Sequence, residues 1–475
     1  MRKLLYTWVM KKTQIGLMGL GTMGGNLARN IASRKFSISL FNHNPNKVDL
    51  FLAAHGTKEM TGCKNVQEFV ASLEKPRKII LMVPAGAAVD ETLAALVDYL
   101  EKGDIVIDGG NSYFKDTIRR QQTLKKIGVH VVGAGISGGE EGALHGPSIM
   151  VGGEKSAWKA IAPILKKVSA KDFDGDTCAG YLGTGAAGHY VKMIHNGIEY
   201  AIMQMIGEVY AMLKSHYKLT NEQIAEFFEV CNEGQLKGYL FEIVPPILRK
   251  KEGKQYLVDL ILDAAKNKGT GKWTSQEALD VGAALPAITQ SVFARYLSTD
   301  KKLRVALSKV RTLKKSKPSQ PLEQFLADLE KALYAGCLMA YSEGLHLLKK
   351  ANEDMKFDLD MSEVIRVWEG GCIIRSKLLK DLRNAKKEIA ASHLLMNKKS
   401  VQQLEKCRPA WVSVVTESLR AGVSAPALTA TLQYFDAMTS AQLPANLIQG
   451  MRDFFGAHTY ERTDKPGIFH TVWND

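Results

Sequence analysis

Short apolar runs alternate with helical patterns over residues 13–185. Five runs rich in β-branched residues have the length of buried strands, and they span 13–18, 37–41, 78–83, 104–108 and 130–133. Strands that alternate with helices in this way are typical of a parallel sheet covered on both faces. We therefore expect an N-terminal α/β region built on a doubly wound sheet.

The pattern changes near residue 186. Long periodic stretches rich in Ala, Leu, Lys and Glu continue from there to about residue 440, and the last part of the chain is rich in aromatic and turn residues. This periodicity predicts a large all-α domain followed by a short tail. A chain of 475 residues is too long for one ordinary core. We expect an extension at 1–12, domains at 13–185 and 186–440, and a C-terminal tail at 441–475.

Composition limits the classes of protein that the chain can belong to. A hydrophobic fraction of 45% and a charged fraction of 24% are typical of a soluble globular protein. No apolar run approaches the roughly 20 residues that a membrane span needs, so no membrane partner is expected. The six scattered cysteines include no CxxC pair, which indicates a reduced, cytoplasmic protein without a zinc or dithiol site.

The net charge of +14 has two interpretations, which are binding of nucleic acid and attraction of a small polyanion. The densest basic run, at 301–317, contains no aromatic residue of the kind that stacks on bases. We interpret it as a solvated surface, and the sequence favours a small polyanionic ligand with no nucleic acid.

A glycine-rich turn follows the first predicted strand and opens a helix. Its residues are Gly19, Leu20, Gly21, Thr22, Met23 and Gly24. Glycine permits a tight turn and lets a pyrophosphate approach the helix N-terminus, where unpaired N–H groups favour anions. The strand–turn–helix context predicts a Rossmann-like dinucleotide site rather than a structural glycine turn.

The end of the second strand bears on the choice of cofactor. Enzymes specific for NAD usually carry an acidic residue there, which accepts a hydrogen bond from the ribose 2′-hydroxyl. This chain has Asn42, His43 and Asn44 instead, with Lys47 close behind. Neutral amides, an imidazole and an amine suit a 2′-phosphate better, so the sequence favours NADP.

Residues 192–200 carry an unusual set of reactive side chains. Spacings of i, i+3, i+4, i+7 and i+8 place on one helical face Lys192, His195, Asn196, Glu199 and Tyr200. A separate apolar stripe suited to core packing is formed by Val191, Ile194, Ile198, Ala201 and Met205. The reactive face can hold a general base and a general acid at a fixed separation. The alternative is an exposed helix with an ordinary Lys–Glu pair.

Two loops follow predicted strands and offer binding groups. Asn111 comes just after the strand at 104–108, at the edge where open α/β sheets bind ligands. Ser137, Gly138 and Gly139 come after the strand that begins at 130, and backbone N–H groups in such a loop can grip a carboxylate. Each loop can also be a plain glycine turn.

Together these motifs resemble the 6-phosphogluconate dehydrogenase family, the decarboxylating enzymes of the pentose phosphate pathway. The resemblance extends to SGGEEGALHGPS at 137–148, GHYVKMIHNGIEY at 188–200, NKGTGKWT at 267–274, SVFARY at 291–296 and RDFFGAHTYER at 452–462. The motifs occur in order from about residue 13 to residue 475. The resemblance implies oxidative decarboxylation of 6-phosphogluconate.

The resemblance also implies roles for individual residues, with Lys192 as the general base and Glu199 as the general acid. The groups expected to hold the substrate carboxylate and hydroxyls are Asn111, Ser137, Gly138, Gly139, His195 and Asn196. The groups expected to hold its phosphate are Tyr200, Lys268, Arg295, Arg452 and His458. The last two are expected from the tail of a second subunit, which implies an obligate homodimer. The expected cofactor contacts are the glycine turn, Asn42–Asn44, Val83, Pro84, Ala85 and Asn111.

Two positions depart from the family pattern near the cofactor. NADP-dependent members usually have Arg at the position of His43, and many have Lys at the position of Pro84. Arginine grips a phosphate with a permanently charged fork, whereas histidine is only partly charged at neutral pH. Use of NAD, or of both cofactors, therefore stays open.

The implied chemistry makes one electrostatic demand on Lys192. An amine removes a hydroxyl proton only when it is neutral, so we expect burial and nearby positive charge to lower its pKa. No metal ligands stand out in the sequence, and the chemistry requires no metal. Another β-hydroxyacid dehydrogenase is the distant alternative, although those chains are much shorter.

Overall fold

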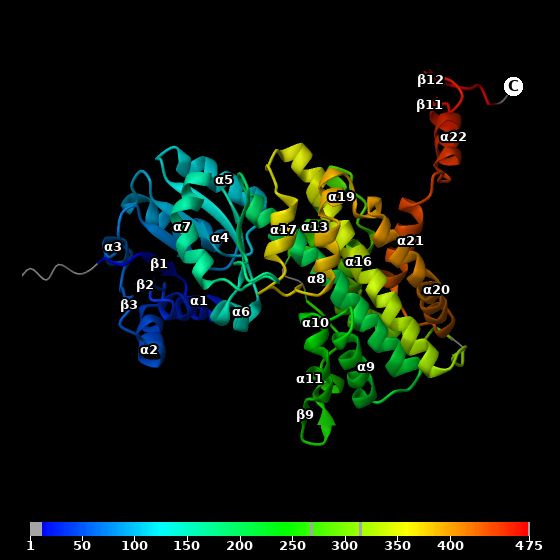
Figure 1. The fold of residues 1–475 in the computed structure, drawn as a ribbon, viewed down its shortest axis with the longest axis horizontal. Helices are drawn as coiled ribbons and strands as arrows, with labels where there is room; N and C mark the ends of the chain where they lie inside the picture. The colour runs from blue at the N-terminus through cyan, green and yellow to red at the C-terminus, as the bar shows by residue number, and fades with distance from the viewer. Residues whose placement is uncertain (1–11, 267–268, 313–315, 474–475) are drawn as a thin grey trace, which may run out of the picture. The chain divides into compact units, whose positions relative to one another are not determined.

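The computed structural model describes residues 12–266, 269–312 and 316–473. The chain divides into two compact units, of which the first ends at Thr431 and the second runs from Leu432. The first unit contains a sheet and a set of helices, and it holds most of the predicted site residues (Figure 1).

The sheet has eight strands in the order β3-β2-β1-β4-β5-β6-β7-β8. The strands are β1 (Ile15–Met18), β2 (Ile38–Phe41), β3 (Met60–Gly62), β4 (Lys78–Leu81), β5 (Ile105–Asp108), β6 (His130–Ser137), β7 (Ser148–Gly152) and β8 (Ala179–Gly183). The predicted parallel pairing holds from β3 to β6, but β7 pairs antiparallel with β6. The chain order reverses at β1, which lies between β2 and β4, and ligands of doubly wound sheets bind at such a switch point.

Helices cover both faces of this sheet, as the sequence pattern predicts. They are α1 (Thr22–Ser33), α2 (Pro45–His55), α3 (Val66–Ala71), α4 (Ala87–Leu96), η1 (Val97–Tyr99), α5 (Phe114–Lys125), α6 (Gly139–His145) and α7 (Lys155–Val168). Alternate residues of a strand point to opposite faces. Accordingly Ile80 of β4 packs in one apolar cluster with residues of α1 and α7, while Ile79 and Leu81 pack in another with residues of α4.

Three long helices form the centre of the helical region. These are α8 (Ala187–Ala211), α16 (Leu322–Met355) and α20 (Lys398–Ala421), and α16 packs against both of the others. The apolar stripe predicted for α8 is confirmed, because Val191, Ile194, Ile198, Ala201 and Met205 are all fully buried. The core of the region therefore runs along one side of the helix that carries the reactive residues.

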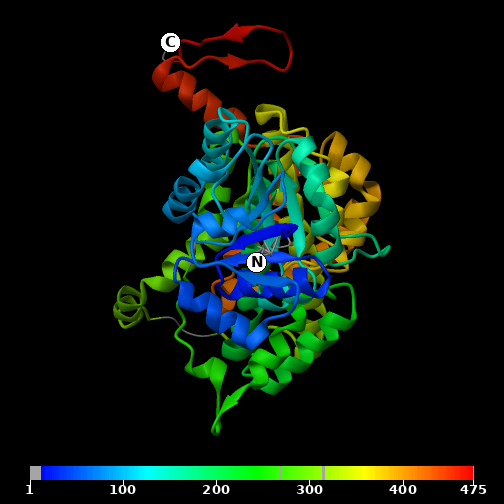
Figure 2. The same cartoon turned by 90° about the vertical axis from the view of Figure 1, so that its left-hand side faces the viewer.

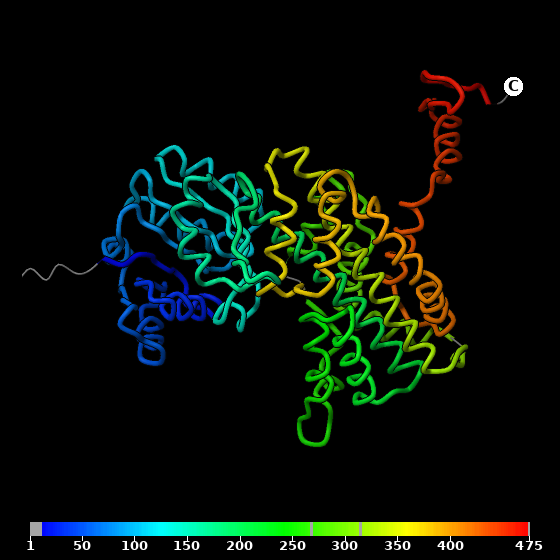
Figure 3. Tube along the Cα trace, viewed as in Figure 1, coloured from blue at the N-terminus to red at the C-terminus, as the bar shows by residue number. Residues whose placement is uncertain are grey.

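Shorter elements surround these three helices. They are η2 (Met212–His216), α9 (Asn221–Glu233), α10 (Tyr239–Glu242), α11 (Val244–Arg249), β9 (Lys251–Glu252), β10 (Gln255–Tyr256), α12 (Leu257–Leu260), α13 (Thr270–Val281), α14 (Pro286–Thr299), α15 (Lys301–Ser308), α17 (Met361–Val367), α18 (Leu378–Asn384), α19 (Lys386–Ala391), η3 (Leu394–Met396) and α21 (Pro426–Met438). β9 and β10 form a short hairpin that projects from the region (Figure 2). The chain returns to the sheet at α17, which contacts β7 and β8 (Figure 3).

The second unit contains a buried carboxylate, that of Asp453. It contains α22 (Ala445–Gly456) and the strands β11 (Tyr460–Glu461) and β12 (Ile468–Phe469), which pair antiparallel. The buried carboxylate of Asp453 accepts hydrogen bonds from the backbone of Thr459 and Thr471 and from the rings of His470 and Trp473, at 2.9–3.0 Å. Burial alone would raise the pKa of Asp453, but these donors lower it to about 2.

Candidate active site

The first half of α8 is buried against the sheet. It contacts β6 and β7, and a Cβ added to Gly135 of β6 would lie 2.3 Å from the Cβ of Lys192. Only glycine leaves room there for the lysine stem. Lys192 is 5% exposed and His195 is fully buried. The alternative of an exposed helix with an ordinary Lys–Glu pair is therefore wrong.

Four polar side chains form a connected cluster at this end of α8. The Lys192 amine donates to Oδ1 of Asn196 over 2.8 Å, and Nδ1 of His195 lies 3.0 Å from the same oxygen. On the other side of the imidazole, Nε2 lies 3.2 Å from the hydroxyl of Ser137. Both His195 contacts are satisfied when Nδ1 donates to Asn196 and the Ser137 hydroxyl donates to Nε2. The structure thus brings together Ser137, Lys192, His195 and Asn196 as the sequence predicts.

Burial shifts the pKa values of the base and the acid of this site in opposite directions. Burial lowers the pKa of Lys192, against the opposing influence of the Glu199 and Cys372 side chains. Burial raises the pKa of Glu199, against the opposing charges of Lys192 and Arg295. The pKa of His195 is held well below its ordinary value, mainly by burial and then by the Lys192 charge. The site therefore favours a neutral amine, a neutral imidazole and a protonated carboxyl.

Two further residues define the far end of the reactive face. Oε2 of Glu199 lies 3.9 Å from Nδ1 of His195. The Arg295 guanidinium, carried by α14, stacks 3.3 Å above the centre of the Tyr200 ring. Of the other predicted phosphate ligands, Lys268 lies outside the described residues. Arg452 and His458 belong to the second unit, where both are exposed.

The loop after β6 is held by a segment that the sequence did not single out. Ser137 is the last residue of β6, and its Oγ accepts a 3.4 Å hydrogen bond from the backbone of Ile373. Gly138 and Gly139 follow with φ of 128° and 63°, and a Cβ on Gly138 would lie 2.5 Å from the carbonyl oxygen of Gly371. The Gly371–Ile373 segment therefore fixes the conformation of the predicted carboxylate-binding loop.

Thr270 and Thr274 also support the cluster, although sequence reasoning missed both. The Asn196 amide donates to the Thr270 hydroxyl over 3.1 Å, and the Thr274 hydroxyl donates to the backbone of Met193 over 2.9 Å. Both threonines lie in the first turn and a half of α13. The GTGKWT motif was the available signal.

Asn111 lies at the carboxyl edge of the sheet, as predicted, and its side chain is exposed. The strand end before it is fixed by Asp108, whose Oδ2 accepts from the Ser112 hydroxyl at 2.7 Å and from Arg120 at 3.3 Å. The His189 imidazole of α8 lies 3.0 Å from the Asp108 carbonyl oxygen. These contacts tie the loop that carries Asn111 to the helix that carries Lys192.

The glycine turn between β1 and α1 fits a pyrophosphate. Gly19 has φ of 101°, and a Cβ there would lie 2.5 Å from the carbonyl oxygen of Met82. A Cβ on Gly21, by contrast, would meet no atom within 4 Å, so the backbone is open at that point. Among the described residues, no side chain caps the start of α1, where Thr22, Met23 and Gly24 form the first turn. Its N–H groups are accessible to an anion.

The predicted specificity residues lie around this turn. Oδ1 of Asn42 accepts a 3.0 Å hydrogen bond from the backbone of Leu20, and Oδ1 of Asn44 caps α2 by accepting from Asn46. His43, between them, is exposed. Val83, Pro84 and Ala85 follow β4, on the other side of β1. The Oδ1 atoms of the two asparagines thus hold the local backbone, whereas His43 and Lys47 are exposed.

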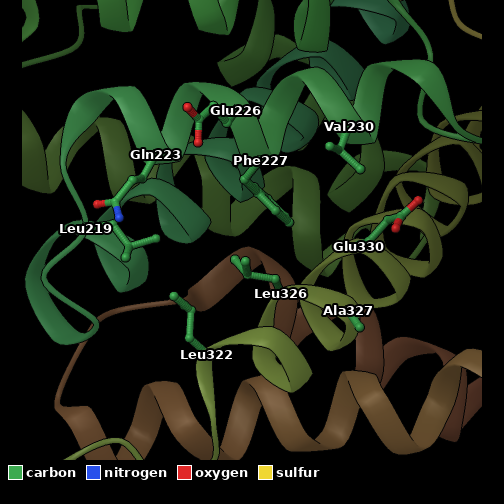
Figure 4. Close-up of a pocket in the computed structure, with 9 residues that line it drawn as sticks. All are labelled: Leu219, Gln223, Glu226, Phe227, Val230, Leu322, Leu326, Ala327 and Glu330. Carbon is green, nitrogen blue, oxygen red and sulfur yellow. The ribbon is translucent and has the colours of Figure 1, made fainter.

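A separate concavity in the first unit lacks such chemistry. It is a groove between α9 and α16, shown in Figure 4. Among the described residues that line it, the titratable ones are Glu226 and Glu330, and the others are mostly apolar. It offers no acid–base pair.

The described part of the chain offers neither a cluster of metal ligands nor a membrane-spanning helix. It contains no group of three or more His, Cys, Asp or Glu residues arranged to hold a metal ion. None of its helices combines the length and apolar character needed to cross a membrane.

Comparison with known proteins identifies the family. Residues 14–183 match the NAD binding domain of 6-phosphogluconate dehydrogenase, and residues 188–473 match the C-terminal domain of 6-phosphogluconate dehydrogenase. The chain is 48% identical over 467 residues to the decarboxylating 6-phosphogluconate dehydrogenase of Klebsiella pneumoniae, covering 98% of this chain and 100% of that protein. It is 48% identical over 469 residues to the NADP(+)-dependent, decarboxylating 6-phosphogluconate dehydrogenase of Bacillus subtilis, with the same coverage of both.

A solved structure agrees with these matches. Plasmodium falciparum 6-phosphogluconate dehydrogenase, studied as the apo form and with NADP+ and 6-phosphogluconate, superimposes with a TM-score of 0.92 at 40% identity, over 97% of this chain and 100% of that one. The fold, the acid–base helix and the full-length similarity agree, and the chain belongs to the 6-phosphogluconate dehydrogenase family.

Proposed function

We propose that this chain catalyses the NADP-dependent oxidative decarboxylation of 6-phospho-D-gluconate to D-ribulose 5-phosphate and CO2. Relatives that match over their whole length carry this activity in their names. The observation that carries the proposal is a pair of residues on α8, in which the buried Lys192 has a lowered pKa and the partly buried Glu199 a raised one. A base and an acid on one helix, beside a loop suited to a carboxylate, match a reaction that removes one proton and later returns another.

The glycine turn and its neighbours would hold the cofactor. The open backbone at Gly21 and the accessible N–H groups at the start of α1 suit a pyrophosphate, and His43 and Lys47 would face a 2′-phosphate. When bound, NADP supplies the acceptor for a hydride. His43 stands where NADP-dependent members of the family usually have a permanently charged arginine. The alternative is therefore that the same site uses NAD for the same reaction.

Lys192 would act first, as the base. Burial lowers the pKa of its amine, which favours the neutral form that can take the proton from the C3 hydroxyl while C3 is oxidised to a ketone. Asn196 holds the amine through its Oδ1, and neutral His195 stands next to both. These two side chains would orient the substrate hydroxyls.

Lys192 would act again in decarboxylation. Once protonated, its ammonium can donate to the C3 carbonyl oxygen, which accepts the electron pair released when the bond to the carboxylate breaks. CO2 leaves and an enediol remains. Ser137, Gly138 and Gly139 would hold the carboxylate until that step, and Asn111 would contact both substrate and cofactor.

Glu199 would complete the reaction as the acid. The enediol becomes ribulose 5-phosphate when substrate carbon C2, which is C1 of the product, receives a proton, and the raised pKa of Glu199 favours the protonated carboxyl that can supply it. Lys192 and Glu199 are seven residues apart, which is roughly 10 Å along a helix axis at 1.5 Å per residue. A substrate lying along the face would meet the two groups at different carbons.

The substrate phosphate would lie beyond Glu199. Tyr200 and Arg295 are already stacked there, and Lys268 would join them. We assign Arg452 and His458 to the same phosphate, supplied by the tail of a second copy of the chain. Remote binding energy of this kind positions the reacting carbons.

Exposed apolar surface supports a homodimer. On α14 and α15 the exposed side chains include Leu297 and Leu307, and on α22 they include Leu447, Phe454 and Phe455, the last being 73% exposed. Apolar surface concentrated in this way marks a protein interface. Equilibrium sedimentation should give a dimer, and a monomer at micromolar concentration would contradict this part of the proposal.

The parts of the chain would divide the work as their sequences suggest. We assign cofactor binding to residues 13–185, substrate binding and dimerisation to 186–440, and completion of the partner's site to the tail at 441–475. Residues 1–11 of the expected extension lie outside the described residues. All six cysteines are buried and unpaired, which suits a reduced compartment such as the cytoplasm.

A direct assay tests the function. The purified chain is given 6-phosphogluconate with NADP or NAD, and nicotinamide reduction and CO2 release are both followed. We expect equal amounts of the two products and a higher kcat/KM with NADP. Nicotinamide reduction without CO2 would point to a different β-hydroxyacid substrate, and no reduction with either cofactor would reject the proposal.

A further inference from the structure

Helix α14 carries Arg295 but has no N-terminal cap of its own. Its N-cap residue is Leu285, whose side chain has no polar atom, and its first residue is Pro286, which has no N–H. The next two residues, Ala287 and Ile288, are fully buried, so their N–H groups cannot turn to water. The first intrahelical bond is made only by the following N–H, from Thr289 to the carbonyl oxygen of Leu285.

Both orphan donors are satisfied by one side chain from another helix. Oε1 of Glu343 accepts from Ala287 over 3.0 Å, and Oε2 accepts from Ile288 over 3.1 Å. Glu343 lies near the middle of α16 and is fully buried. A carboxylate at the start of a helix also interacts favourably with the helix dipole.

The arrangement occurs twice in the chain. Glu208 of α8 is 1% exposed and accepts from Ala427 and Leu428 over 2.8 and 2.9 Å, at the start of α21. This helix also begins with a proline, Pro426. The helical region can be divided into a first half, from α8 to α15, and a second half, from α16 to α21. A central helix of each half thus caps a proline-initiated helix of the other half. Because the same arrangement occurs twice, we interpret the carboxylate caps as a regular feature of the helical region rather than as incidental contacts.

We propose that Glu343 is a positioning residue for the substrate phosphate, acting by holding α14 so that Arg295 lies over Tyr200. The proposal rests on the function proposed above. Arg295 follows Ala287 by eight residues, or about 12 Å along the helix at 1.5 Å per residue. Glu343 therefore does not touch the phosphate, and its effect passes through the axis and rotation of α14.

The contacts at the other end of α14 are weaker and depend on this placement. The Arg295 guanidinium stacks on Tyr200 and reaches the carbonyl oxygen of Lys266 only at 3.4 Å. The residue is partly exposed, and no carboxylate pairs with it among the described ion pairs. A shift of the helix would thus move the guanidinium without breaking a strong bond.

The variant that tests the proposal is Glu343→Gln. A glutamine has the same shape but one acceptor oxygen, so its amide donor would face one of the two backbone donors. Burial raises the pKa of Glu343, and the Ala287 and Ile288 N–H groups oppose that rise by donating to its carboxylate. We expect KM for 6-phosphogluconate to rise by about tenfold with kcat nearly unchanged, which is the effect of losing one charged hydrogen bond between Arg295 and the substrate phosphate.

A substrate without a phosphate separates positioning from general damage. With gluconate, which has nothing for Arg295 to hold, kcat/KM should be the same for Glu343→Gln and the unmodified chain. A variant that merely loosens the fold would lose activity toward both substrates. Glu343→Asp keeps the charge and withdraws the carboxylate by one methylene, so it should give a smaller rise in KM and serves if the glutamine variant does not fold.

A matched control and a cycle complete the experiment. Thr220→Ala removes the side-chain cap of α9, a helix that holds no proposed site residue, and should lower Tm without changing KM. Arg295→Ala should raise KM, and adding Glu343→Gln to it should raise KM no further. An unchanged KM in Glu343→Gln, or equal losses with both substrates, would overturn the positioning role while leaving the proposed function intact. Failure of the unmodified chain to bind or turn over 6-phosphogluconate would overturn both.

Discussion

The amine of Lys192 donates to Oδ1 of Asn196, one turn further along α8, over 2.8 Å. Both side chains are buried, and the Asn196 amide is anchored in turn by the Thr270 hydroxyl. An amide oxygen accepts from a neutral amine as well as from an ammonium ion. The pair therefore fixes the position of the amine without forcing it to keep its proton.

Replacing Lys192 should remove the base. Lys192→Met keeps the stem of the side chain, and general-base contributions of about 10²- to 10⁴-fold are typical, so kcat should fall by at least that factor. Far-ultraviolet circular dichroism and binding of NADP should be unchanged. Turnover near that of the unmodified chain would exclude Lys192 as the base.

The same variant should change how stability depends on pH. Because the folded chain lowers the pKa of Lys192 below 10.5, the unfolded chain binds more protons between the lowered value and 10.5. The free energy of unfolding should therefore rise with pH across that window, and the rise ends once both states are neutral. Urea titrations at a series of pH values should show this slope in the unmodified chain and a smaller slope in Lys192→Met.

Glu199→Gln should impair the final protonation. Its amide cannot give a proton to C1, so formation of ribulose 5-phosphate should slow by about 10²-fold or more. In the unmodified chain, activity should rise with pH as Lys192 loses its proton and fall as Glu199 loses its proton. The falling limb of the kcat profile should be absent in Glu199→Gln. A falling limb at the same pH in both proteins would assign it to another group.

His43→Arg should increase the preference for NADP. A guanidinium adds a charged hydrogen bond to the 2′-phosphate, so kcat/KM for NADP should rise by about tenfold relative to NAD. His43→Ala is the matched control, and it should leave kcat/KM for NAD unchanged. Equal effects of His43→Arg on both cofactors would mean that residue 43 does not meet the 2′-phosphate.

Removing Arg452 or His458 from the tail should weaken substrate binding. Arg452→Ala and His458→Ala should each raise KM for 6-phosphogluconate by about tenfold, and a chain ending before Arg452 should raise it further. Lys465→Ala removes another exposed cation of the same unit and should have no effect. If KM is the same in the shortened chain, the tail does not contribute to the phosphate site.

Periodicity made the reactive helix predictable from sequence. The spacing from Lys192 to Tyr200 fixed which side chains share a face, and the apolar stripe from Val191 to Met205 fixed which side is buried. The lowered pKa expected for Lys192 agrees with the structure, where burial is the main cause and the Glu199 and Cys372 side chains oppose it. Local pattern was sufficient here because a helix relates its own residues.

Features that depend on distant segments were not predictable in this way. β3 has three residues and no distinct pattern, and the antiparallel direction of β7 depends on how the chain turns through α6. The Ile373–Ser137 contact joins residues 236 positions apart. The local sequence also does not show that Glu343 caps α14. A single glutamate in an apolar helix indicates that the residue is buried, but it does not indicate which group the carboxylate contacts.

The crossed carboxylate caps make the two halves of the helical region depend on each other. A fragment ending between α15 and α16 would retain α14 but lose Glu343, and the remaining fragment would retain α21 but lose Glu208. Each fragment would thus lack the carboxylate that accepts from two backbone donors buried in the intact chain. The halves should unfold in a single cooperative step, and fragments expressed apart should gain structure only when mixed.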